Sequence, residues 1–273
     1  MHAGRPEKTE SESESGHPEA LTSAPGMVQS SPRRKPRVNE EGKPALRLSI
    51  IIPVLNEERT IQEVLERVRA VPLSVEKEIL VVDDGSTDDT GTILERERGK
   101  GDLEALRHEQ NRGKGAAIRT ALDHATGDWV IIQDADLELN PEEYPGLLEP
   151  LLQGKAQVVY GSRFLAGSPG IPWVQRLANW GLTWFTNLLF GSRLTDMETC
   201  YKVIPLPLLH NLDLRANRFD IEPEITAKLL RQGYRIHEVP ITYKYRDRNR
   251  GKKMRARDGF SALYMLIKCR VTS

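Results

Sequence analysis

Residues 130–136 read Val-Ile-Ile-Gln-Asp-Ala-Asp, an apolar run that ends in two carboxylates one residue apart. In an extended strand, side chains at positions i and i+2 point to the same side, so Asp134 and Asp136 can converge on one point. A hard divalent cation such as Mg²⁺ or Mn²⁺ is a natural occupant of such a point. The alternative is an acidic loop that simply ends a strand, because Asp-x-Asp is a common pattern.

Two more apolar runs of strand length precede this stretch, and polar residues follow each of them. The runs are residues 48–52 and 78–82, with apolar residues at helical spacing between them. A further helix is predicted from Gly113 onward. The order strand, helix, strand, helix, strand, helix, strand indicates an α/β fold with a Rossmann-like, mostly parallel sheet and helices on both faces. The residues predicted to face the core from two of the helices are Ile61, Val64, Leu65, Val68, Ile118, Ala121, Leu122 and Ala125.

Four motifs stand in a fixed order along the first half of the chain. They are Pro-Val-Leu-Asn-Glu at 53–57, Asp-Asp-Gly-Ser-Thr at 83–87, Gly-Lys-Gly at 113–115 and Asp-Ala-Asp at 134–136. Together they resemble the family 2 glycosyltransferases of GT-A fold. The resemblance implies a nucleoside-diphosphate sugar donor, a divalent metal, and a hexosyl transfer that inverts the anomeric centre.

Three later segments narrow the resemblance to one branch of that family. They are Val-Tyr-Gly-Ser-Arg-Phe at 159–164, Thr-Asp-Met-Glu-Thr-Cys-Tyr-Lys-Val at 195–203 and Gly-Lys-Lys at 251–253. They look like the branch that contains dolichyl-phosphate mannose synthase and the polyprenyl-phosphate glycosyltransferases. The resemblance covers residues 46–270 and does not specify the sugar, so GDP-mannose and a UDP-hexose both stay open as donors.

The residues of the predicted donor site follow from the charge that a departing diphosphate carries. A cation held by Asp134 and Asp136 would stabilise that charge as it develops, which makes Asp136 the first catalytic candidate. Glu138 can reach the same cation or be an exposed loop acid, and the resemblance favours the metal role. Asp84 can accept a hydrogen bond from a nucleobase N–H, and Lys114 at a helix start can meet an anion. The resemblance adds Pro53, Leu55, Glu57, Asp134 and Ala135 as nucleotide contacts.

The acceptor is predicted from positively charged side chains that could bind a phosphate, rather than from a general base that could activate a hydroxyl. A lipid phosphate is already ionised at neutral pH and needs positive groups that fix and orient it. Residues 244–257 contain eight basic residues and one acid, and Arg163 follows the strand predicted at 157–160. A basic run is otherwise a solvated face, and a nucleic-acid partner is not expected because no reading motif accompanies it. The resemblance favours contact of Lys252 with the diphosphate or with a polyprenyl- or dolichyl-type phosphate.

A soluble or glycan hydroxyl acceptor remains the alternative. Many relatives continue into transmembrane helices, whereas this sequence stops at Ser273. A hydroxyl needs a general base, for which Asp196 or Glu198 would be the first candidates. Both acids can instead belong to a structural turn. A sugar-phosphate nucleotidyltransferase is disfavoured because residues 53–58 lack a Gly- and Arg-rich loop, and a degenerate nucleotide-binding module is disfavoured by the intact pair of aspartates.

Two amphipathic segments suggest where a lipid lies. Residues 172–190 hold three of the four tryptophans, together with leucines and one arginine, which favours a membrane interface over a core helix. A second apolar stripe at residues 260–267 precedes Lys268 and Arg270, and core packing explains it equally well. We therefore expect peripheral contact with a membrane surface, or a separate membrane-anchoring protein.

Composition agrees with one catalytic domain and a tail. The 273 residues carry a formal net charge of zero and are 38% apolar. Residues 1–45 are rich in Ser, Glu, Pro and Gly and are predicted to be disordered, whereas residues 46–273 can bury a sizeable core. Neither a signal-peptide core nor a run of ~18 apolar residues is present. Cys200 and Cys269 are predicted to be reduced core residues, and a cytoplasmic location at the inner face of a membrane is expected.

Overall fold

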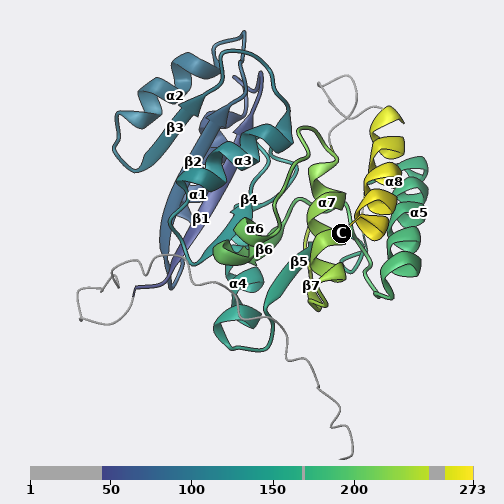
Figure 1. The fold of residues 1–273 in the computed structure, drawn as a ribbon. Helices are drawn as coiled ribbons and strands as arrows, with labels where there is room; N and C mark the ends of the chain where they lie inside the picture. Colours follow the sequence, from purple (N-terminus) through teal and green to yellow (C-terminus); the bar gives the residue numbers. More distant parts are fainter. Residues whose placement is uncertain (1–44, 168–169, 246–255, 273) are drawn as a thin grey trace, which may run out of the picture. The chain divides into compact units, whose positions relative to one another are not determined.

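The computed structural model describes residues 45–167, 170–245 and 256–272, so most of the predicted tail and most of the basic run lie outside the described residues. One sheet holds its strands in the order β3-β2-β1-β4-β6-β5-β7 (Figure 1). The strands are β1 (Arg47–Val54), β2 (Glu76–Asp83), β3 (Leu103–Arg107), β4 (Trp129–Ile132), β5 (Val158–Ser162), β6 (Lys202–Pro205) and β7 (Ile236–Pro240). The helices are α1 (Ile61–Ala70), α2 (Thr90–Arg98), α3 (Lys114–His124), η1 (Pro141–Glu143), α4 (Tyr144–Leu152), α5 (Trp173–Phe190), α6 (Leu206–Asn211), α7 (Ile221–Arg231) and α8 (Ala256–Val271).

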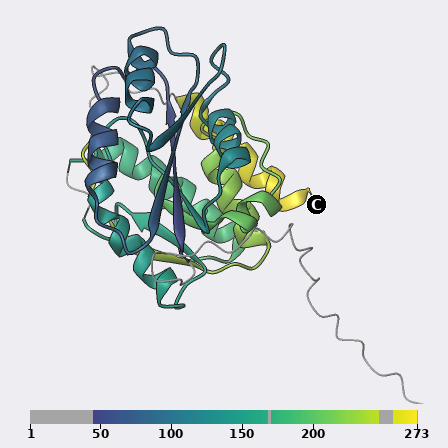
Figure 2. The same ribbon diagram turned by 90° about the vertical axis from the view of Figure 1, so that its left-hand side faces the viewer.

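The central strands are parallel and apolar along their length because helices cover both of their faces. In the register, Ile51 of β1 faces Leu80 of β2 on one side and Ile132 of β4 on the other. All three side chains are buried. Figure 2, which views the sheet from its β3 side, shows helices on either side of it. The prediction of a mostly parallel sheet between two helical layers is confirmed, with four of the six strand pairings parallel.

The helices bury the faces that the sequence predicted. In α1 the apolar residues recur at positions i, i+3, i+4 and i+7 and form one inward stripe, and in α3 a corresponding stripe packs on β1 and β2. All eight core residues predicted for these helices are buried: Ile61, Val64, Leu65, Val68, Ile118, Ala121, Leu122 and Ala125.

One strand runs against the others, and it decides where the later motifs lie. Strand β6 pairs antiparallel with both β4 and β5, so its first residue, Lys202, lies near the carboxyl ends of those strands. The segment 195–201 that leads into β6 therefore reaches the same edge of the sheet as residues 134–136. Motifs separated by about sixty residues in sequence converge there.

Helices α5 and α8 lie beside α7, away from the four N-terminal strands (Figure 1). Helix α8 packs against both α7 and α5, and Arg270 of α8 donates a hydrogen bond at 3.1 Å to the Leu189 carbonyl oxygen near the end of α5. Within the described ranges, no helix combines the length and the apolarity that crossing a membrane requires.

Candidate active site

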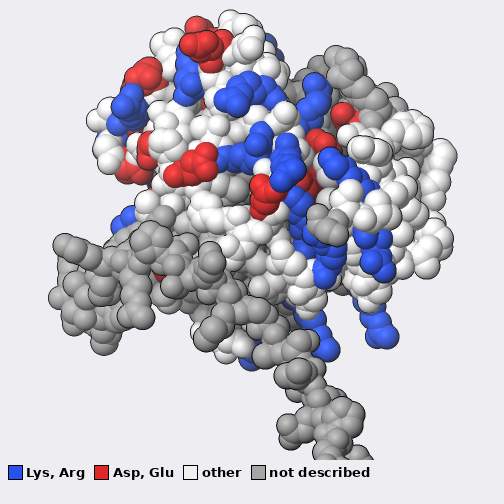
Figure 3. Space-filling model, in the orientation of Figure 1, with Lys and Arg blue, Asp and Glu red and all other residues white. Residues whose placement is uncertain are grey.

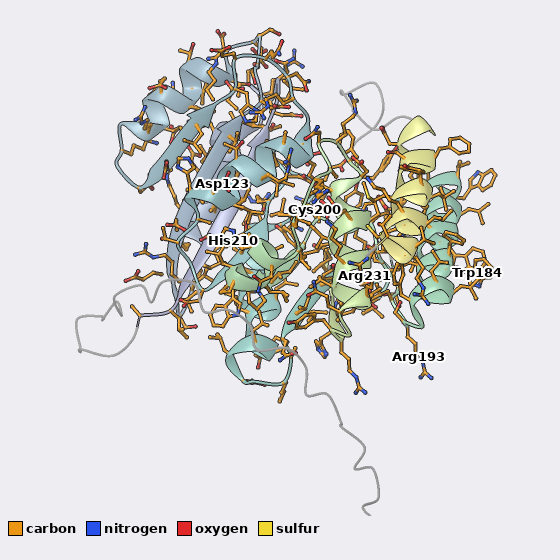
Figure 4. The ribbon with its side chains drawn as sticks, viewed as in Figure 1. Asp123, Trp184, Arg193, Cys200, His210 and Arg231 are labelled. Atoms are coloured by element: carbon orange, nitrogen blue, oxygen red, sulfur yellow. The ribbon has the colours of Figure 1, made fainter. Side chains whose placement is uncertain are left out.

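The site lies at the carboxyl edge of the sheet, where the loops after β1, β2 and β4 meet. Thr60, which precedes α1, donates a hydrogen bond from Oγ1 to the Ala135 carbonyl oxygen at 2.7 Å and contacts a Glu57 carboxylate oxygen at 3.0 Å. This contact joins the first motif to the Asp-x-Asp loop. Cys200 lies behind the loop, with Sγ 3.5 Å from the Ile132 carbonyl oxygen, near the centre of the view in Figure 4.

Lys114 is paired inside the protein rather than directed to solvent. Its ammonium lies 2.8 Å from Asp134 Oδ1 and 3.2 Å from Glu222 Oε1. Burial alone would lower the pKa of Lys114, but attraction to Asp134, Cys200 and Glu222 together outweighs burial and the pKa lies well above its ordinary value. Burial would likewise raise the pKa of Asp134, and Lys114 reverses this so that the pKa is lowered. The two predicted nucleotide contacts, Lys114 and Asp134, therefore form one ion pair.

The helix that presents Lys114 starts from a glycine that no other residue can replace without strain. Gly113 has φ +102°, and a Cβ at that position would collide with the Asn217 carbonyl oxygen. Its N–H donates to Asp84 Oδ2 at 2.7 Å, and the N–H of Arg112 donates to Asp84 Oδ1 at 2.9 Å. Asp84 thus fixes the loop that leads into α3.

Asp84 has little capacity left for a nucleobase. His108 Nδ1 lies 2.7 Å from Asp84 Oδ1, in addition to the two backbone N–H donors of the loop. A carboxylate offers about four acceptor positions, so one is left for a base N–H. Pro53 and Leu55 are partly buried at the end of β1, and Glu57 is buried. Contact of these three residues with a nucleotide stays a prediction.

Asp136 carries a charge that its surroundings do not neutralise. Burial, and then repulsion from Asp134 and Glu138, raises the pKa of Asp136 to about 7. The Glu138 N–H donates to Asp136 Oδ1 at 3.2 Å, while the Tyr243 hydroxyl donates to the Glu138 carboxylate at 2.5 Å. A cation at this loop would relieve the repulsion.

The predicted metal ligands fit a cation that a substrate helps to hold, not a ready protein cage. Across the described part of the chain, no three acidic, His or Cys side chains are grouped so that they could hold a metal ion. Asp134 is paired with Lys114 and Glu138 with Tyr243, so Asp136 would be the first ligand of a cation and Asp134 the second. Magnesium sites of nucleotide enzymes commonly use one or two carboxylates together with substrate phosphates. The roles of Asp134, Asp136 and Glu138 as ligands stay predictions.

Arg163 and Asp196 form a second ion pair at the same edge. Asp196 is 0% exposed and accepts hydrogen bonds from Arg163 Nε and Nη2, both at 2.7 Å, and from the Arg163 backbone N–H at 3.0 Å. Asn179 of α5 adds a fourth at 3.2 Å. Burial lowers the pKa of Arg163, but Asp196 outweighs burial and the pKa is raised. The alternative role of Asp196 as a general base is therefore not supported, because its carboxylate is inaccessible and is used to hold Arg163.

A third acid, Glu238, holds the turn before β6 in addition to Asp196. Glu238 of β7 accepts hydrogen bonds from the backbone N–H groups of Thr195, at 2.8 Å, and Asp196, at 3.0 Å. Burial, opposed by Lys202, raises the pKa of Glu198 to about 7. Glu198 remains the other candidate for a general base. Lys252 lies outside the described residues.

Sequence reasoning missed Glu222, Lys202 and Tyr243. Glu222 Oε2 lies 2.5 Å from the Lys202 ammonium, and both side chains are buried. The Tyr243 ring lies 5.3 Å from the Arg163 guanidinium. A signal for Glu222 exists in the pattern, since it stands between Ile221 and Ile225 on the apolar side of a helix, where an acid requires a partner.

Helix α5 is amphipathic, but its polar face is buried and its apolar face is exposed. Its buried residues are the polar Asn179, Thr183 and Thr186, while Trp173, Trp180 and Trp184 are 75%, 63% and 53% exposed. Trp184 is directed outward at the edge of the view in Figure 4. The interpretation of these tryptophans as core residues is wrong. The other exposed large apolar residues of α5 and α8 are Val174, Leu177, Leu188, Phe260, Tyr264, Ile267 and Val271.

Helix α8 divides its apolar residues between two faces. Leu266 is buried with Ala262, Met265 and Cys269, whereas the other face adds to the exposed surface of α5. Helix α5 contains no acid, and the outer edge over both helices is largely white in Figure 3. Cys200 and Cys269 are both free and buried, as predicted.

Comparison with known proteins agrees with these observations. Residues 49–204 match the family model described as glycosyl transferase family 2. An undecaprenyl-phosphate mannosyltransferase of Micrococcus luteus is 31% identical, over 76% of this chain and 87% of that protein. A UDP-N-acetylglucosamine–dolichyl-phosphate N-acetylglucosaminyltransferase of Methanococcus voltae is 28% identical, over 80% and 94%. Among solved structures, glucosyl-3-phosphoglycerate synthase of M. tuberculosis aligns with a TM-score of 0.61 at 25% identity, over 82% of this chain and 79% of that one.

Proposed function

Because the chain belongs to glycosyl transferase family 2 and has the GT-A fold, we propose that it transfers one sugar from a nucleoside diphosphate to a polyprenyl- or dolichyl-type lipid phosphate. Residues 46–273 form the catalytic domain in this proposal. The two relatives described above support this class of acceptor, because their names specify an undecaprenyl phosphate and a dolichyl phosphate. The donor is GDP-mannose or a UDP-hexose.

The observation that best supports a lipid-phosphate acceptor is the position of helix α5, which joins the site to an apolar surface. On its inner face, Asn179 donates a hydrogen bond to Asp196 and thereby supports Arg163. On its outer face, three tryptophans are exposed. A lipid phosphate has both parts that this helix addresses, a charged head for Arg163 and a chain for the apolar surface. A soluble hydroxyl acceptor would give the exposed face no role.

The donor half rests on the loop at residues 134–136. A Mg²⁺ or Mn²⁺ ion held by Asp136 and Asp134 would neutralise the diphosphate as it leaves. Thr60 contacts both Ala135 of this loop and Glu57, and Asp84 orders the loop before α3. Arg163 orients the acceptor phosphate for in-line attack on the anomeric carbon. The phosphate arrives ionised, so no side chain has to remove a proton.

We also propose that the protein attaches peripherally to the cytoplasmic, inner face of a membrane. Tryptophan and leucine on one exposed helix face suit the boundary between headgroups and acyl chains. Helix α5 has no acid to repel an anionic surface, and the basic run 244–257 would add attraction. A separate membrane-anchoring protein is the alternative occupant of this face.

A second candidate is transfer to a soluble or glycan hydroxyl. One observation favours it: the pKa of Glu198 is raised to about 7, which is the range of an effective general base. In this case Glu198, not Asp196, takes the acceptor proton. The two candidates share the donor site and differ only in the acceptor.

A screen of donors against acceptors tests both candidates. Purified protein with Mn²⁺ or Mg²⁺ is supplied with GDP-mannose, UDP-glucose or UDP-N-acetylglucosamine, and with a short polyprenyl phosphate, the corresponding polyprenol or a soluble glycan. We expect sugar on the phosphate and none on the polyprenol or the glycan. Product on soluble alcohols alone would contradict the lipid-phosphate acceptor and leave only the donor half of the proposal.

A further inference from the structure

Four alternating charges run from the donor site into the core. Asp134 lies 2.8 Å from the Lys114 ammonium, and the same ammonium lies 3.2 Å from Glu222 Oε1. Glu222 Oε2 lies 2.5 Å from the Lys202 ammonium. The Glu222 side chain is 5% exposed and that of Lys202 is 0% exposed. Two carboxylates therefore share Lys114, one at the site and one beneath it.

The two carboxylates hold Lys114 unequally. Asp134 forms the shorter contact, whereas Glu222 Oε1 is buried and has no properly directed hydrogen bond. A buried acceptor without a hydrogen bond is unfavourable, so a small shift of the ammonium toward Glu222 would be stabilising. Lys202 keeps the Glu222 carboxylate in position for that shift, because a buried ion pair loses its compensation when the partners separate.

We infer that Glu222 is a positioning residue of the donor site, which draws Lys114 away from Asp134 when Asp134 turns to a metal-bound diphosphate. This inference rests on the proposed function. An ammonium held against Asp134 repels a cation at the same carboxylate, and a second carboxylate behind the ammonium reduces that repulsion. Glu222 thereby raises the affinity of the site for the metal without touching it.

The Glu222→Gln variant tests this role because glutamine keeps the shape and removes the charge. Among the four alternating charges, Lys114 then has only Asp134 as a partner of opposite charge. The metal ion must compete with the Lys114 ammonium for the Asp134 carboxylate. We expect the half-saturating Mn²⁺ concentration to rise about tenfold, the lower end of the effect of removing outer-shell support from a metal site. The measurement is calorimetric titration of MnCl₂ into protein that is saturated with UDP and, separately, with GDP.

The chain offers a matched control on the same helix. Glu224 is also buried and pairs with a lysine, Lys228, at 2.7 Å, but it touches neither Lys114 nor Asp134. Glu224→Gln should lower the melting temperature as Glu222→Gln does and leave the Mn²⁺ affinity at the wild-type value. A second variant, Glu222→Gln with Lys202→Met, removes the unpaired buried ammonium and carries the test if Glu222→Gln does not fold.

The outcomes separate this inference from the function on which it rests. Wild-type protein that binds no Mn²⁺ with either nucleotide would contradict the proposed function and the inference together. Normal Mn²⁺ binding by the wild type and by the folded glutamine variants would overturn only the role of Glu222. An equal loss of affinity in Glu224→Gln would also overturn it, because the effect would then come from a general loosening of α7.

Discussion

Asp136 destabilises the metal-free protein at neutral pH. Its pKa is raised to about 7 by burial and by the neighbouring acids, whereas an unfolded chain has a value of about 3.9. Between these values the folded state binds more protons than the unfolded state, so the free energy of unfolding falls as the pH rises through this window. Asp136→Asn removes that loss. With EDTA present, the variant should melt higher than the wild type at pH 8 and show no such gain at pH 4. If the melting temperatures of the variant and the wild type differ by the same amount at every pH, Asp136 is not repelled by its acidic neighbours.

The same residue should be required for turnover. Without the Asp136 carboxylate, the leaving diphosphate loses the group that holds its counter-charge, so Asp136→Ala should lower kcat by about a hundred- to a thousandfold. Added Mn²⁺ and nucleotide should raise the melting temperature of the wild type and not that of the variant. Activity that survives both this substitution and chelation by EDTA would show that no metal is needed.

Arg163 and Asp196 should behave as one unit. Arg163→Lys keeps a positive charge but loses the two-pronged contact with Asp196, and Asp196→Asn releases the same guanidinium from the other side. Each should slow transfer to polyprenyl phosphate by about a hundredfold through misplacement of the acceptor. The double variant should be no slower than either single one.

The pH profile separates this positioning role from base catalysis. We expect the rate of Asp196→Asn to stay flat from pH ~6.5 to ~8.5, above the second ionisation of a phosphate monoester. Because the pair is bidentate, Asp196→Asn should cost about as much as a substitution of Arg163. If the rate losses of the Arg163 and Asp196 variants add fully in the double variant, the two residues do not act as one unit. If the wild-type pH–rate profile has a basic limb that disappears only in Asp196→Asn, Asp196 removes a proton.

At the level of elements, α5 is placed with its apolar face outward. We expect the protein to co-sediment with anionic vesicles at low salt and to be released as salt increases, because charge attraction is screened. Replacing Trp180 and Trp184 by Ala should reduce binding at every salt concentration. Leu152→Ala, which removes a 41% exposed leucine from α4, is the control and should have no effect. Equal loss in the control, or no binding by the wild type, would contradict the membrane assignment.

The sequence could predict that α5 exists but not which of its faces is outward. Its apolar residues surround much of the helix, so periodicity alone fits a core helix as well as an interfacial one. Burial of Asn179, Thr183 and Thr186 depends on partners that are distant in sequence, above all Asp196. Helix α1, by contrast, carries one apolar stripe, and its buried face follows from spacing alone.

For the whole molecule, local pattern predicted the parallel half of the sheet better than the rest. Strands β1, β2 and β4 each read as an apolar run followed by a polar motif. The antiparallel course of β6 left no such signal, although it brings residues 195–201 to the site. Individual site residues were recognisable by motif, but their pairing was not, because Lys114 with Glu222 and Arg163 with Asp196 are long-range contacts that only the fold defines.

The N-terminal segment should be separable from this fold. Residues 1–40 are rich in Ser, Glu, Pro and Gly and nearly lack large apolar side chains, so they cannot offset the entropy lost on ordering. Deleting them should change neither the melting temperature nor the transfer rate to a short polyprenyl phosphate. The comparison is made on full-length and truncated protein in the same buffer, with vesicle binding measured in parallel because Arg33, Arg34, Lys35 and Arg37 are removed as well. A melting temperature lowered by several degrees would show that the segment docks on the catalytic domain, whereas weaker vesicle binding alone would assign those basic residues to the membrane.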